Sequence, residues 1–106
     1  MNTETFPAPG HTYEARFGDL AFHLKFDAEG KTMRFTSAEA LDFNTAESVI
    51  YRALFLRPGL FLVTWTEADA TTVTHVEDFD KGLVHTNITK PDHTFLNLSG
   101  SWTRLS

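Results

Sequence analysis

Apolar and polar residues alternate along most of this 106-residue chain, and turn-forming residues interrupt the alternation every eight to twelve positions. The segment 20–26 is the clearest case, with leucine or phenylalanine at every second position and His23 and Lys25 between them. Successive side chains of a strand point to opposite faces, so the pattern predicts strands joined by short turns. Helical spacing is nearly absent. Only 37–46 could hold a turn or two of helix, and a loop is the simpler interpretation. We therefore predict an all-β fold.

We expect eight or nine strands. In chain order they cover 11–17, 20–26, 31–36, 48–56, 60–67, 71–79, 83–89, 94–98 and a last segment, 100–105. Such a meander favours a small eight-stranded up-and-down antiparallel barrel, because closure removes exposed strand edges. A two-sheet sandwich is the alternative. The length fits a single domain spanning 1–106, with 1–10 as an extended segment before the first strand.

Composition narrows the classes of partner. The chain has no cysteine, so it has no disulfide and no thiolate nucleophile or metal ligand. Its net charge is −5 and its positive residues are scattered, whereas nucleic-acid binding requires a basic stripe. Apolar runs are too short to span a membrane, and the N-terminus lacks the apolar core of a signal peptide. We expect a cytoplasmic protein with a small-molecule partner, without nucleic acid, membrane or cofactor.

The pairing register, carried through the turns, predicts which side chains point inward. We take Pro58-Gly59 as a two-residue loop, pass 68–70 with a two-residue loop, take 80–82 as a three-residue loop, and cross to the next strand at Pro91-Asp92. This register gives one face that is the more apolar. The expected interior residues are Ile50, Leu54, Leu56, Phe61, Val63, Trp65, Val76, Val84, Ile88 and Phe95. The same face carries the polar residues Arg52, Glu67, Asp78, Thr86 and Asn97. The opposite face, expected to meet solvent or a second subunit, carries Thr64, Thr66, His75, Glu77, His85 and Asn87.

Apolar walls with a few convergent polar groups are typical of a small-molecule site. Arg52 is expected beside Trp65 and within reach of Glu67 for an ion pair. This pair could orient a ligand or simply close the mouth of the barrel, since a buried charge needs a partner or water. The predicted function is binding of a small, largely apolar or aromatic ligand. The predicted ligand-binding residues are Tyr13, Phe22, Arg52, Phe61, Trp65, Glu67, Asp78, Phe95 and Asn97.

Two alternatives remain open. Burial could raise the pKa of Glu67 or Asp78, and Arg52 could hold a substrate carboxylate, which together would suit a cofactor-independent lyase or isomerase. An outer face carrying His75 and His85 could instead form a homodimer. These histidines and Glu77 are also a potential metal-ligand trio. Because the register places them on the outside, no metal site is predicted.

The order of residues resembles the MoaF-like family, whose members are related to molybdenum cofactor biosynthesis protein F. The resemblance rests on the runs 57–67 (RPGLFLVTWTE) and 73–79 (VTHVEDF), and continues through 86–89 and Pro91-Asp92 to Gly100 and Trp102. Upstream, 10–13 and 20–22 also fit. The resemblance implies a lipocalin-like (calycin-type) barrel, and it carries over no catalytic residue.

Overall fold

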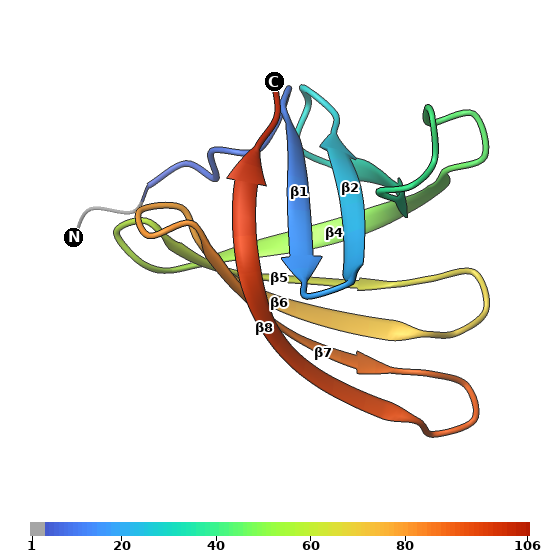
Figure 1. Cartoon of the computed structure of the whole chain (residues 1–106). Coiled ribbons are helices and arrows are strands. Elements are labelled where there is room, and N and C mark those ends of the chain that lie inside the picture. Colours follow the sequence, from blue (N-terminus) through green and yellow to red (C-terminus); the bar gives the residue numbers. More distant parts are fainter. Residues whose placement is uncertain (1–3) are drawn as a thin grey trace.

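The computed structural model describes residues 4–106, which form a closed barrel of eight antiparallel strands (Figure 1). The strands are β1 (Thr12–Phe17), β2 (Leu20–Phe26), β3 (Thr32–Ser37), β4 (Glu47–Arg57), β5 (Leu60–Thr66), β6 (Thr72–Asp78), β7 (Leu83–Thr89) and β8 (Phe95–Arg104). Each strand pairs with the next, and β8 pairs with β1. The predicted eight-stranded up-and-down barrel is confirmed, and the last two predicted segments are one strand, β8. The segment 38–46 is a loop of turns and bends. Within residues 4–106, no helix is long and apolar enough to cross a membrane.

The two ends of the barrel differ. One end, which we call the closed end, carries the β2–β3, β4–β5 and β6–β7 turns and is covered by residues 4–11 (Figure 1). Glu4 Oε1 accepts a hydrogen bond of 2.7 Å from the N–H of Gly59 in the β4–β5 turn. The Phe6 ring lies 5.3–5.7 Å from the rings of Phe26, Tyr51, Phe61 and Phe79. The other end, the open end, carries the β1–β2 turn, the loop 38–46 and the β5–β6 and β7–β8 turns.

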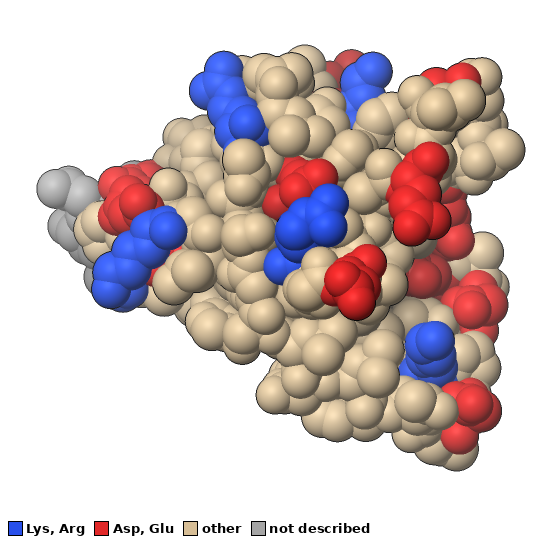
Figure 2. Space-filling view, in the orientation of Figure 1, with Lys and Arg blue, Asp and Glu red and all other residues tan. Residues whose placement is uncertain are grey.

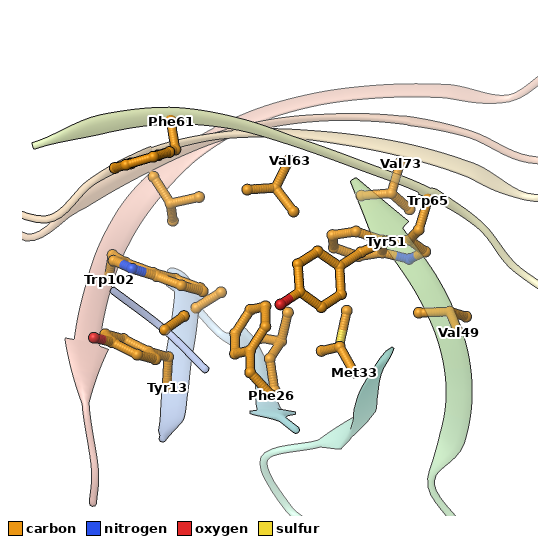
Figure 3. Close-up of a cluster of buried hydrophobic side chains, with 14 of the residues drawn as sticks. Tyr13, Phe26, Met33, Val49, Tyr51, Phe61, Val63, Trp65, Val73 and Trp102 are labelled. Atoms are coloured by element: carbon orange, nitrogen blue, oxygen red, sulfur yellow. The ribbon is translucent and has the colours of Figure 1, made fainter. Parts of the chain in front are cut away.

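Aromatic side chains fill the closed half of the interior (Figure 3). Tyr13 stacks on Trp102 with ring centroids 4.8 Å apart and planes 8° from parallel. Phe26 meets Tyr51 edge-to-face at 5.3 Å. Offset-stacked and edge-to-face pairs each contribute about 0.5–1.5 kcal/mol beyond the burial of their area. This half of the barrel is therefore a packed core.

Part of the predicted register is correct. Phe26 pairs with Met33 and Leu24 with Phe35 across the β2–β3 hairpin, as expected from a turn at Glu29-Gly30. On β5 the expected residues also face inward. On β7 they do so because two errors cancel: the loop before β6 is longer than expected by one residue, and the β6–β7 turn has four residues rather than the expected three, since Asp78 pairs with Leu83. The inward residues of these two strands are Phe61, Val63, Trp65, Val84, Thr86 and Ile88.

The predicted facing of β4 is wrong. Pro58-Gly59 does form a two-residue turn, since Arg57 pairs with Leu60, but the next pair is Phe55 with Phe61. The extra residue is a β-bulge, which shifts the register by one and exchanges the two faces. Ile50 is consequently 79% exposed. The expected interior residues Arg52, Leu54 and Leu56 also point outward, and Val49, Tyr51, Ala53 and Phe55 take their places.

The predicted facing of β6 and β8 is wrong for a different reason. The loop 68–70 lies between the paired Glu67 and Thr71, and its last residue, Ala70, has a left-handed φ of 75°. The loop 91–93 is built in the same way, with His93 at φ 71°. Three-residue loops that end in this conformation are common hairpin connections, and they reverse the parity expected of two-residue loops. As a result, β6 turns Val76 outward, and β8 turns Phe95 and Asn97 outward.

Phe6 is expected to stabilise the barrel by sealing its closed end. Replacing a buried phenylalanine with alanine typically costs 3–5 kcal/mol, and Phe6 is half-buried. We expect Phe6→Ala to lower the free energy of unfolding by about 2 kcal/mol in denaturant titrations. Phe95→Ala is the matched control, because Phe95 is 58% exposed and its loss should change stability by less than about 0.5 kcal/mol. Equal effects of the two changes would contradict this assignment.

Gly100 is expected to stabilise the contact between β1 and β8 that closes the barrel. A Cβ atom at this position would overlap the carbonyl oxygen of Arg16 on β1, where β1 and β8 meet. The backbone would have to move, and overpacking of this kind typically costs 1–3 kcal/mol. We expect Gly100→Ala to lower the midpoint of thermal unfolding by several degrees. Ser101→Ala, at the exposed neighbouring position, should leave the midpoint nearly unchanged.

Candidate functional site

A cavity of about 320 Å³ occupies the open half of the barrel. Its walls are mainly apolar, and its aromatic members come from four different strands: Phe17 from β1, Phe22 from β2, Phe35 from β3 and Trp65 from β5. The remaining wall residues are Ala15, Leu20, Leu24, Val73, His75, Ile88 and Leu96. The packed aromatic residues of the closed half form the floor of this cavity. The barrel therefore holds an apolar space that is closed at its floor and reached from the open end.

Polar groups gather at the rim of the cavity. Trp65 Nε1 donates a hydrogen bond of 3.1 Å to Glu67 Oε2 and so links the wall to the rim. Burial raises the pKa of Glu67, the hydrogen bond from Trp65 opposes this rise, and the nearby carboxylates of Glu47 and Asp69 add to it. Asp69, Thr71 and Lys90 also line the opening.

A histidine and a glutamate lie in the interior of the barrel, on β6. His75 Nδ1 is 2.9 Å from Glu77 Oε2, and the two side chains are 5% and 0% exposed. The His75 ring lines the cavity and meets Trp65 edge-to-face, with ring centroids 4.8 Å apart. Burial raises the pKa of Glu77, and the hydrogen bond to His75 partly opposes the rise. We refer to these two residues as the His75–Glu77 pair.

Several buried polar side-chain atoms inside the barrel have no partner among the described residues. They are Glu77 Oε1, Tyr51 Oη, Thr86 Oγ1 and Trp102 Nε1. Thr86 lies directly opposite His75 on the neighbouring strand β7. Burial, with a contribution from Asp27 and Glu77, raises the pKa of Tyr51 to about 12, so Tyr51 stays neutral. Buried polar groups are normally hydrogen-bonded, so these four atoms are unusual as unused donors and acceptors in the barrel interior.

The structure brings only three of the nine predicted site residues to the cavity: Phe22, Trp65 and Glu67. Tyr13 and Phe61 face inward but belong to the packed closed half. Asp78 is buried for another reason, since its carboxylate accepts hydrogen bonds from the N–H groups of Asp80 and Lys81 in the β6–β7 turn.

The other three predicted site residues lie outside the barrel. Arg52 lines a shallow groove on the outer surface of β4 and β5. Phe95 is exposed, and Asn97 bonds to Asn87 on the outer surface of the β7–β8 hairpin. An orienting or catalytic role for Arg52 inside the barrel is therefore excluded by the bulge in β4.

His75 and Glu77 are the interior polar residues that the sequence reasoning placed on the wrong face. A signal was present: the two residues are two positions apart and must share a face, and Val73 lies on that face too. His85 does point outward, where its ring bonds to Ser99 Oγ, so His75 and His85 form no common outer face. Among residues 4–106, no three histidine, aspartate or glutamate side chains are grouped as metal ligands.

Charge on the outer surface is dispersed. In Figure 2, lysine and arginine side chains are separated by tan and acidic surface, with no continuous basic stripe on the face shown. On the exposed face of β1 and β2, Glu14 lies between Arg16 and His23 at 3.1 Å and 3.0 Å. Such exposed pairs each contribute little to stability, about 0–1 kcal/mol. The outer surface thus shows no concentrated group of charges on the face drawn, whereas the His75–Glu77 pair and several unpaired polar atoms lie inside the barrel.

The raised pKa of Glu77 predicts a pH-dependent stability. When the pKa of a carboxyl group is higher in the folded than in the unfolded chain, its contribution to the free energy of unfolding is fully present at a pH below the unfolded-state pKa. That contribution is lost as the pH rises through the folded-state pKa. Compared with Glu77→Gln, the wild-type protein should therefore lose unfolding free energy as the pH rises from about 4 upward. The loss should be about 1.4 kcal/mol for each pH unit that separates the folded from the unfolded pKa. Parallel stability–pH curves for the two proteins would contradict this expectation.

Comparisons with known proteins agree with the architecture. A crystal structure described as a "putative beta-lactamase" from Burkholderia vietnamiensis superposes with a TM-score of 0.86 at 28% sequence identity, and the alignment covers 97% of this chain and 100% of that one. No curated protein sequence matches significantly. The family model described as MoaF-like matches residues 9–103, from the N-terminal segment to the end of β8. The chain belongs to the MoaF-like family.

Proposed function

We propose that this barrel binds a small, mostly apolar or aromatic molecule in its open half. The observation that supports the proposal best is the contrast between the two halves of one interior. Eight-stranded barrels can be filled by side chains or can hold one small ligand. Here the closed half is packed, whereas the open half has aromatic walls around about 320 Å³. This volume is at the lower end of the range for ligand pockets, which suits a molecule of one or two rings.

The cavity also indicates how such a ligand is oriented. Its flat apolar part would lie against Trp65 and Phe35, whose rings are 6.4 Å apart on the wall. A polar substituent would point either to His75 in the depth or to Glu67 and Lys90 at the rim. Two acidic residues and one lysine at the opening disfavour strongly anionic ligands, because an anion would meet Glu67 and Asp69 on entry.

The description of the Burkholderia relative raises the question of β-lactam hydrolysis. Serine-dependent hydrolysis needs a nucleophilic hydroxyl activated by a base. Thr71 is the hydroxyl-bearing residue among those that line the cavity, and the chain has no cysteine. Thr71 lies at the rim, where its neighbour is Asp69 rather than a histidine. This arrangement favours a binding cavity over a covalent hydrolase site.

Isothermal titration calorimetry with naphthol tests the binding proposal. We expect saturable binding with a negative heat-capacity change, the mark of apolar surface removed from water. Ile88→Trp should fill part of the cavity and weaken binding at least about tenfold, which corresponds to about 1.4 kcal/mol.

Ile50→Trp is the matched control for this experiment. It introduces the same side chain at an outward position that is 79% exposed, so binding should be unchanged. No binding to the wild type, or equal loss in both variants, would overturn the proposed function.

A further inference from the structure

We propose that His75 is a general base at the inner end of the cavity, positioned by Glu77, and that it acts on small aromatic carbon acids. The proposal rests on the proposed function, because the substrate must enter the same cavity. Its geometric basis is the 2.9 Å contact between His75 Nδ1 and Glu77 Oε2, together with the placement of the His75 ring on the cavity wall. A further activity is thus assigned to a pair of residues that ligand binding alone does not require.

Glu77 determines which nitrogen of His75 is available. At a pH above the raised pKa of Glu77, Nδ1 donates its proton to the Glu77 carboxylate, and the neutral imidazole carries its free lone pair on Nε2. Nε2 is the ring nitrogen that Glu77 does not engage. The carboxylate also stabilises the imidazolium that forms when Nε2 accepts a proton, as the buried acid does in histidine-based triads. Glu77 is therefore a positioning residue, and His75 is the catalytic one.

The surroundings strengthen the attraction between the Glu77 carboxylate and a protonated His75. Trp65, Phe35 and Phe22 keep the wall apolar, and electrostatic interactions are stronger in such a water-poor space. The other titratable groups around the pair are Tyr13 from β1, Tyr51 from β4, Glu67 from β5, and Asp69 and Lys90 at the rim. Among them, Glu67 is the competing carboxylate base to be tested, because it lies on the cavity wall beside Trp65.

The expected step is a proton abstraction that needs no further reactant. Nitrobenzisoxazole, a flat two-ring carbon acid, is a suitable probe. His75 Nε2 takes the proton from the C–H of the isoxazole ring, and the electron pair of that bond forms the third bond of the nitrile. The N–O bond breaks, and its electron pair stays on the oxygen as cyanonitrophenolate. The coloured product reports the rate directly.

The central experiment measures kcat/KM for nitrobenzisoxazole as a function of pH, with binding of the same probe followed by calorimetry. The wild type should accelerate the reaction over buffer, and deuterium at the reacting carbon should slow it. His75→Gln keeps a hydrogen bond to Glu77 but has no basic nitrogen, so kcat/KM should fall at least about 100-fold. Glu77→Gln should lower the plateau about tenfold and move the acid limb of the pH profile to lower pH, because the imidazolium loses its carboxylate.

His85→Gln is the matched control, since His85 points outward and bonds to Ser99. It should leave the rate unchanged, and thermal unfolding should show that all variants are folded. Absence of probe binding to the wild type would overturn the proposed function and this proposal together. Binding without acceleration, an unchanged rate in His75→Gln, or loss of activity in Glu67→Gln alone would overturn the general-base proposal and leave the binding function standing.

Discussion

The pairing of β8 with β1 turns a row of eight strands into a tube, and it leaves each strand residue only two directions, the interior or water. Where these two strands meet, the backbone of Gly100 lies so close to the Arg16 carbonyl that a Cβ atom would overlap it. Once the tube is closed, a single inner set of side chains must both fill one half and line the cavity in the other. A change of register in any one strand therefore changes the chemistry of the interior without changing the fold.

The relation between sequence and structure follows from this. Alternation and turn residues were enough to predict the strand number, the barrel and the β2–β3 register, because these depend on local patterns that repeat along the chain. The faces of β6 and β8 depended on whether a loop has two or three residues. The deciding feature was a left-handed φ at Ala70 and His93. Glycine at these positions would have indicated this conformation in the sequence, whereas alanine and histidine do not. The bulge at Leu56 in β4 likewise has no glycine or proline at the extra residue to reveal it.

These one-residue differences in register changed most of the residues that were predicted for the site. Trp65, Phe22 and Glu67 were placed correctly on the cavity because β2 and β5 kept their predicted faces. Arg52 was predicted inside the barrel and lies outside it, whereas His75 and Glu77 were predicted outside and lie inside. Each difference results from a register shift of one residue. The interior polar chemistry thus changed from a predicted arginine–carboxylate pair to a histidine–carboxylate pair. The latter has a neutral form that can accept a proton, which a guanidinium lacks at physiological pH.

Phe6 and Glu4 cover one end of the barrel, so the two ends of the molecule have different roles. The packed aromatic core lies at the closed end, whereas the cavity opens at the other end beside the β1–β2 turn and the loops 67–71 and 90–94, where Leu20, Asp69 and Lys90 line it. Substitutions in these loops are therefore expected to change the entrance of the cavity without loosening the aromatic core. In the proposed binding function, the entrance would set which ligand is bound, whereas the contacts of Glu4 and Phe6 with the closed end would contribute to stability.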